Sequence, residues 1–183
     1  MTNLRFSTAR QVVDAFPILE DDFKGEDIQS HPVEFVARLV ETGKVQEAIA
    51  LCAFMLPRHI AVRWLCENLR KFGNGFPAND EAFLKLAERW VQNPVEKNRS
   101  AALNAAMTSG FKTAPAWAAA AAGWSGGNIG NDPEKPVPPP PYLTGQAVKV
   151  GFILSYWNVF GDTRQLRAAE AVGHALELLQ VAK

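Results

Sequence analysis

The sequence predicts an all-α protein of stacked antiparallel helical hairpins, arranged as an irregular bundle or a short solenoid-like array. Apolar residues recur at helical spacing along most of the chain, and the alternating pattern of half-buried strands is scarce. Turns rich in Gly, Pro and Asn separate the periodic segments, and most of these turns are short. Because short connections leave consecutive helices side by side, we expect antiparallel neighbours.

The composition is that of one ordinary globular domain spanning residues 1–183. Hydrophobic residues make up 48% of the chain and charged residues 21%, which excludes a disordered protein and a coiled-coil rod. The 19 basic and 19 acidic residues cancel. A nucleic-acid partner is therefore not expected, because neutralising phosphates requires a basic face.

Capping residues and a proline mark the first helix. Ser7 or Thr8 can cap its start, and Pro17 ends it. The acidic segment from 20 to 27 contains Gly25, so we expect an exposed turn there.

The next two helices form a predicted hairpin. Pro32 suits the first turn of a helix that Gly43 ends. Another helix runs from about 44 to 56, and the turn between the two is so short that they should pack antiparallel. Its expected buried face consists of Val45, Ile49, Cys52 and Met55.

Four helices are predicted in the middle of the chain. They run from Pro57 to Phe72, from Asn79 or Asp80 to Val91, from Pro94 to Thr108 and from Ala114 to Trp124. Glycines end the first and third of these helices, and Thr113 can cap the fourth. The fourth is almost pure alanine, whose small side chain lets a neighbouring helix come close.

A strap rich in Pro and Gly, from about 125 to 142, interrupts the helical pattern. Its prolines favour an extended polyproline II segment, and we expect residues 136–141 to pack against the helices. An apolar helix from Leu143 to Phe160 follows and should be buried on several faces. The expected apolar stripe of the final helix is Leu166, Ala169, Val172, Leu176 and Leu179.

Signals for catalysis, metal binding and cofactor binding are weak. Ser125 does not lie in a GxSxG motif, and no strand precedes it. Cys52 and Cys66 are expected to be buried, reduced thiols. The three histidines form no zinc motif and lie far apart in the sequence, at His31, His59 and His174. We therefore predict no catalytic residue, no cofactor and no metal.

A basic stretch beside Trp64 favours protein binding. Arg58, His59 and Arg63 precede this tryptophan on one predicted helix. Trp and Arg are enriched at binding hot spots, so the three basic side chains are candidate partner-binding residues. The alternative interpretation places Trp64 in the core and leaves the basic side chains merely exposed.

The proline run offers a second candidate surface, with Pro139 and Tyr142 as partner-binding residues. Polyproline segments are ligands for grooves lined with aromatic side chains. The alternative, which we favour, is a stiff strap across the helices, because an apolar helix follows it in the same domain.

The chain is expected to be cytoplasmic and to have no contact with a membrane. Residues 1–22 contain neither a long apolar core nor a small-residue cleavage site, so no signal peptide is predicted. The most apolar stretch, 150–160, has about half of the roughly 20 residues that a membrane span needs.

Three stretches, in this order, resemble a family of uncharacterised bacterial all-helical proteins of about this length. They are LPRHIAVRWLCENLR (56–70), AWAAAAAGWSGGNIG (116–130) and VPPPPYLTGQAVKVGFIL (137–154). The resemblance covers roughly residues 30 to 180. It implies a gene setting near type VI secretion components, beside effectors and their adaptor chaperones, and it implies no catalytic residue.

These observations predict a non-enzymatic accessory or adaptor protein that binds another protein. As the resemblance implies, the partner would be an effector, a chaperone or a secretion component. One alternative is an immunity protein that blocks a toxin through the same kind of surface, where the acidic segment from 20 to 27 would matter more. A second is a small enzyme that uses His59 with Ser125 or Cys66.

Overall fold

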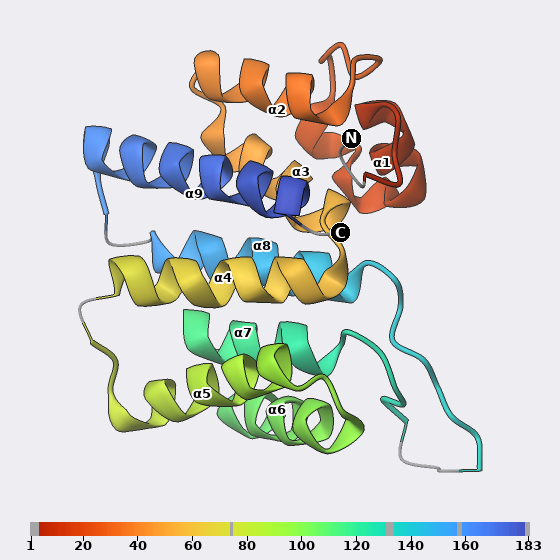
Figure 1. The fold of residues 1–183 in the computed structure, drawn as a ribbon, viewed down its shortest axis with the longest axis vertical. Helices are drawn as coiled ribbons and strands as arrows, with labels where there is room; N and C mark the ends of the chain where they lie inside the picture. Colours follow the sequence, from red (N-terminus) through yellow and green to blue (C-terminus); the bar gives the residue numbers. More distant parts are fainter. Residues whose placement is uncertain (1–3, 74, 131–133, 157–158, 182–183) are drawn as a thin grey trace.

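Most helices lie across the view in Figure 1, one above another, and form a stack. The computed structural model describes residues 4–73, 75–130, 134–156 and 159–181, and these residues form helices and turns without a strand. The predicted all-α class is therefore confirmed. The α-helices are α1 (Ala9–Ala15), α2 (Pro32–Glu41), α3 (Val45–Met55), α4 (Arg58–Phe72), α5 (Ala78–Gln92), α6 (Glu96–Ser109), α7 (Ala114–Gly123), α8 (Leu143–Ser155) and α9 (Gly161–Val181).

The last helix decides between the two predicted arrangements. α9 returns to the N-terminal part of the chain and packs against α2, α3 and α4 (Figure 1). In a solenoid, each repeat touches only its neighbours in the sequence. Because α9 lies against helices from the other end of the chain, the fold is an irregular bundle.

Two helices, α3 and α7, are buried on nearly every side. α7 contacts α4, α5, α6 and α8, and its alanines leave room for all four. α3 contacts α2, α4, α8 and α9. The predicted one-sided buried face of α3 is therefore too narrow, since Ala48, Leu51 and Phe54 are buried as well.

Glycine allows α6 and α7 to approach each other closely at Gly123. A Cβ added to Gly123 would lie 2.6 Å from Leu103 Cβ and 2.8 Å from Leu103 Cα. We expect Gly123→Ala to lower the free energy of unfolding by about 1–3 kcal/mol, because two helix backbones must move apart.

Gly173, within α9, provides the matched control for this prediction. A Cβ added there has no atom within 4 Å, so Gly173→Ala should raise the free energy of unfolding by about 0.5–1 kcal/mol through the lower backbone entropy of alanine. Urea unfolding of both variants measures the two changes. Changes of the same sign would contradict the close packing at Gly123.

Several helix starts follow the predicted capping signals. Thr8 Oγ1 accepts a hydrogen bond from Gln11 N at 3.3 Å, and Thr113 Oγ1 accepts one from Ala116 N at 3.4 Å. Pro32 occupies the first position of α2. These side chains and the proline act locally, which is why the sequence alone locates them.

Three boundary or burial predictions are wrong. α5 begins at Ala78 rather than after an Asn79 or Asp80 cap, and the Asp80 carboxylate instead accepts a hydrogen bond from Thr113 Oγ1 at 2.7 Å. α8 ends at Ser155, short of Phe160; residues 157–158 lie outside the described ranges. Leu166 is 70% exposed, because the face of α9 that packs inward starts at Ala168.

Trp64 lies at the centre of the bundle and joins three helices. Its side chain, from α4, is fully buried. The indole Nε1 donates a hydrogen bond to Ala171 O of α9 at 2.7 Å, and the ring centroid lies 4.1 Å from that of Phe152 in α8. The interpretation of Trp64 as a core residue is therefore correct, and the residue offers no surface to a partner.

The buried Arg99 of α6 holds the beginning of the strap against the bundle. Its guanidinium donates hydrogen bonds to Gly123 O and to Asn128 O, and it pairs with the Glu96 carboxylate at 2.6 Å. Asn128 Oδ1 in turn accepts hydrogen bonds from Gly130 N and Val137 N. One arginine therefore fixes the end of α7 and the two arms of the strap that meet at Asn128.

The strap packs on the bundle over only part of the predicted range. Pro136 and Pro138 are exposed, whereas Pro139 is buried and Pro140 is half-buried. In Figure 1 the strap extends away from the helices before it returns to α8. Within residues 136–141, burial is thus limited to Pro139 and Pro140. Residues 131–133 of the predicted strap lie outside the described ranges.

Candidate functional site

A solvent-open groove of about 680 Å³ follows α4 where this helix faces α5. We call it the α4 groove. Helical spacing places its α4 residues on one face, since they lie three or four positions apart. It is lined by His59, Arg63, Cys66, Glu67, Arg70 and Lys71 of α4 and by Glu88, Val91 and Gln92 of α5.

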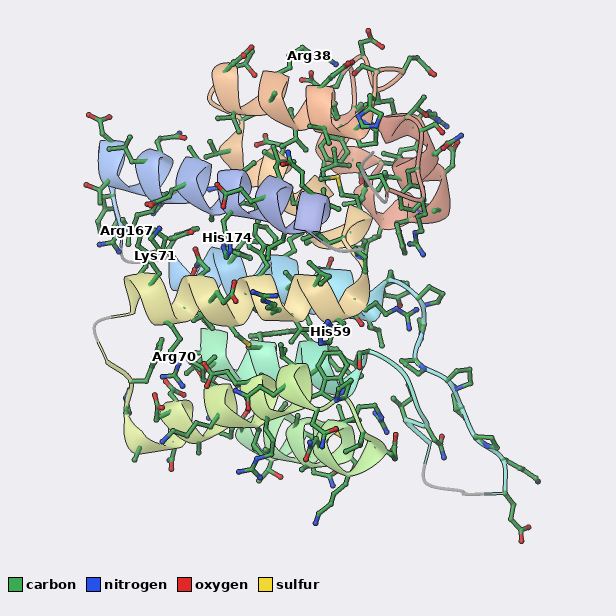
Figure 2. All side chains as sticks on the ribbon, in the orientation of Figure 1. Arg38, His59, Arg70, Lys71, Arg167 and His174 are labelled. Atoms are coloured by element: carbon green, nitrogen blue, oxygen red, sulfur yellow. The ribbon has the colours of Figure 1, made fainter. Side chains whose placement is uncertain are left out.

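Arg70 is the most connected charge in the α4 groove. Its Nε and Nη2 donate to the two Glu88 carboxylate oxygens at 2.6 and 2.7 Å, and its Nη1 donates to Glu81 Oε2 at 2.7 Å. Figure 2 shows Arg70 projecting from α4 toward α5. This bidentate pairing with Glu88 fixes the geometry of the Arg70 side chain and links α4 to α5.

A second set of charges joins α4 to α9 on the other border of the groove. Arg63 Nε lies 2.7 Å from Glu67 Oε1, and His174 Nε2 of α9 lies 3.1 Å from Glu67 Oε2. Lys71 Nζ lies 2.5 Å from Glu170 Oε1, also on α9. Lys71 and His174 appear along this border in Figure 2. Three helices therefore contribute charges of both signs to one surface.

His59 closes the groove at the N-terminal end of α4. Its Nε2 lies 2.8 Å from Val91 O, at hydrogen-bonding distance, and its ring packs 5.5 Å from the Trp90 ring. The His59 imidazole is thus held against α5 and forms the end of the α4 groove.

The Arg70 guanidinium holds the pKa of the Glu81 carboxyl below its ordinary value of 4.5, mainly through their hydrogen bond. A carboxyl with a lowered pKa contributes stability above pH 4.5 that is lost as the pH falls through its folded-state pKa. We expect Arg70→Gln to raise the pKa of Glu81 toward its ordinary value. An NMR titration of the glutamate side-chain carbonyls measures this shift.

Glu96 is the control in the same titration, because Arg99 and not Arg70 lowers its pKa. The pKa of Glu96 should stay low in the Arg70→Gln variant. An unchanged pKa of Glu81 in this variant would contradict the assigned pairing.

The structure separates the five predicted partner-binding residues. His59 and Arg63 lie in the α4 groove. Arg58 points elsewhere and donates a hydrogen bond to Ser125 O at 3.0 Å. Pro139, near the end of the strap, is buried, which removes it as a surface contact. Tyr142 is 39% exposed beside the start of α8.

Sequence reasoning missed most of the charges in the groove. The repeat of Arg63, Glu67 and Lys71 at four-residue spacing marks one charged helix face and was visible in the sequence. The contributions of Glu88 and His174 were not visible, because only the packing of α5 and α9 brings them to α4.

Neither candidate nucleophile is activated. Ser125 Oγ donates a hydrogen bond to Ala122 O at 2.6 Å, so its proton goes to a backbone carbonyl and not to a base. Cys66 is 3% exposed, and burial raises the pKa of its thiol. Cys52 is also buried and free.

Within the described residues, no group of three His, Cys, Asp or Glu side chains has the arrangement to hold a metal ion. The described histidines serve other contacts; His31 Nδ1, for example, accepts a hydrogen bond from Val33 N at 3.4 Å at the start of α2. Among the helices in the described ranges, none combines the length and the apolar character needed to cross a membrane.

Comparison with known proteins identifies one family. The model of DUF6931, described as a family of unknown function, matches residues 35–179. The match begins in α2 and ends in α9, so it includes the whole α4 groove. No curated protein and no solved structure matches the chain.

Proposed function

We propose that this chain, which belongs to the DUF6931 family, is a non-enzymatic accessory or adaptor protein that binds another protein through the α4 groove. One observation carries the proposal. Charges of both signs from α4, together with Glu88 of α5, line a single open groove of about 680 Å³. Glu170 and His174 of α9 pair with Lys71 and Glu67 of this lining. The expected partner surface places acidic side chains opposite the basic residues of the groove and basic side chains opposite its acidic residues.

The energetics of the groove favour exchange of charge partners. The Arg63–Glu67 and Lys71–Glu170 pairs are largely exposed, and exposed pairs contribute about 0–1 kcal/mol each. A partner can therefore replace one member of a pair at little cost in stability. Complementary charges then select the partner and speed its approach.

The resemblance to proteins encoded near type VI secretion components supports a choice of candidate partners. An effector, an adaptor chaperone or another secretion component would use the groove as a docking surface. A toxin bound at the same groove would instead support the immunity-protein alternative.

Charge reversal in the groove tests the proposal. Purified products of the neighbouring genes are assayed for binding by pull-down and then by calorimetry. We expect at least one to bind, and Arg63→Glu to weaken that binding by about tenfold or more, because it places a like charge opposite the partner.

Lys97→Glu on α6 is the matched control, since Lys97 is exposed and lies outside the groove. It should change the affinity by less than about twofold. Equal effects of the two reversals, or no binding by any neighbouring product, would contradict the proposal.

A further inference from the structure

A second, smaller cavity of about 180 Å³ lies where the N-terminal ends of α4 and α8 meet the C-terminal end of α3 and the segments on either side of α1. It is distinct from the α4 groove, and the two share no lining residue. Its walls combine apolar side chains with two arginines, Arg5 and Arg58. We call it the arginine cavity.

Both arginines line this cavity, and neither has an acidic partner among the described residues. The Arg5 guanidinium stacks 4.5 Å from the centroid of Phe6 and 5.5 Å from that of Phe16. Arg58 donates one hydrogen bond, to the neutral carbonyl of Ser125. Among the described residues, no carboxylate lies within ion-pair distance of either guanidinium, whereas Arg99 has one.

The electrostatics of the pair agree with this geometry. Burial and then the nearby positive charge of Arg58 lower the pKa of Arg5. Two like charges held at one cavity repel each other, and an anion between them relieves that repulsion.

The remaining walls determine which anion fits. Phe16, Phe54, Met55 and Pro141 present apolar surface, and Thr144 adds one hydroxyl that already donates to Trp124 O at 3.0 Å. The two guanidinium groups match the two oxygens of a carboxylate. Phosphate would bring additional oxygens that face apolar walls, and leaving such oxygens without donors is costly.

The size of the cavity limits the ligand. A water molecule occupies about 30 Å³ in the liquid, so a cavity of about 180 Å³ has room for roughly six such volumes. That space suits a carboxylate attached to a short branched hydrocarbon group and excludes a drug-sized ligand, which needs about 300 Å³ or more.

We propose that the arginine cavity binds an organic carboxylate that carries a small apolar group, with the carboxylate between Arg5 and Arg58 and the apolar group against Phe16 and Phe54. Two sources offer this chemistry: a free short-chain carboxylic acid, and the terminal carboxylate of a peptide that ends in an apolar residue.

NMR titration of the isotope-labelled chain tests the proposal with 4-methylpentanoate and its neutral amide, 4-methylpentanamide. The acid should shift resonances of residues lining the cavity, such as Phe54 and Gly145. The amide should bind at least about tenfold more weakly than the acid, because it cannot form the two charge-assisted pairs. Equal binding of acid and amide, or shifts confined to other parts of the chain, would overturn the proposal.

Arg5→Gln is the informative variant, because Arg5 is exposed and donates no hydrogen bond to another described residue, whereas Arg58 also holds Ser125. It should weaken binding of the acid by about tenfold or more. Arg89→Gln on α5 is the matched control and should leave binding unchanged. Equal affinity in the Arg5→Gln variant and the parent would overturn the assignment.

Two further ligands distinguish a free carboxylic acid from a peptide terminus as the source of the carboxylate. N-acetyl-leucine binding more tightly than 4-methylpentanoate supports a peptide terminus, and the reverse order supports a free acid. Inorganic phosphate that binds as tightly as the acid would overturn the carboxylate assignment. The Arg63→Glu variant should bind 4-methylpentanoate normally, so this proposal and the proposed function can fail independently.

Discussion

Replacement of Trp64 by alanine is expected to lower the free energy of unfolding by about 3–5 kcal/mol, which is the largest effect that we predict for a single side chain. The ring is fully buried between α4, α8 and α9, and its removal leaves a cavity. The change also removes the indole N–H that donates to Ala171 O. Urea unfolding followed by circular dichroism measures the loss.

Trp117 provides the comparison for this prediction. It is only partly buried and packs in a small aromatic cluster with Phe111 and Trp124, with ring centroids 5.3 and 6.2 Å away. Trp117→Ala should therefore cost less than Trp64→Ala. A loss below about 1 kcal/mol for Trp64→Ala would contradict its central position, because such small changes are typical of surface sites.

Arg99→Met is expected to lower the free energy of unfolding by about 3 kcal/mol, since each buried polar group left without a partner costs about 1–3 kcal/mol. Methionine fills part of the space but donates no hydrogen bond. Gly123 O and Asn128 O then lose the guanidinium that now satisfies them. The strap should loosen together with the end of α7, and limited proteolysis should show faster cleavage between 125 and 138.

The matched control for Arg99 is Arg89→Met, since Arg89 is an exposed arginine on a neighbouring helix. Its effect on unfolding should stay within about 0.5 kcal/mol. If Arg99→Met leaves both the unfolding free energy and the cleavage rate unchanged, Arg99 does not anchor the strap.

Local signals in the sequence predict most of the helices. Thr8, Pro32 and Thr113 act within one helical turn, so their roles follow from the sequence alone. The α5 boundary was missed because Asp80 bonds to Thr113, which lies 33 positions away. A competing tertiary partner thus overrides a local capping signal.

Burial around a whole helix was harder to predict than burial of one face. Periodicity selected one face of α3, but α8 and α9 return from the far end of the chain and cover its other sides. The same return places Ala168 rather than Leu166 against the core. No pattern within a single helix encodes which distant helix will cover it.

The candidate site shows the same division between local and distant information. His59 and Arg63 were identified because they precede a tryptophan on one predicted helix. The pairing of Arg70 with Glu88 and of Glu67 with His174 depends on helix packing, so the charged groove itself was not predicted. The burial of Pro139 agrees with the favoured strap and not with its prediction as a partner-binding residue, since the proline run is exposed at its start and buried only near its end.

Site-specific photo-crosslinking tests the central claim, that the α4 groove is the partner-binding surface, most directly. A benzophenone amino acid replaces Gln92, which is exposed and lines the groove, or Asn104, which is exposed on α6 outside it. With the partner captured from the neighbouring gene products, we predict a crosslink from position 92 and none from position 104. A crosslink from position 104 with none from position 92 would contradict the account.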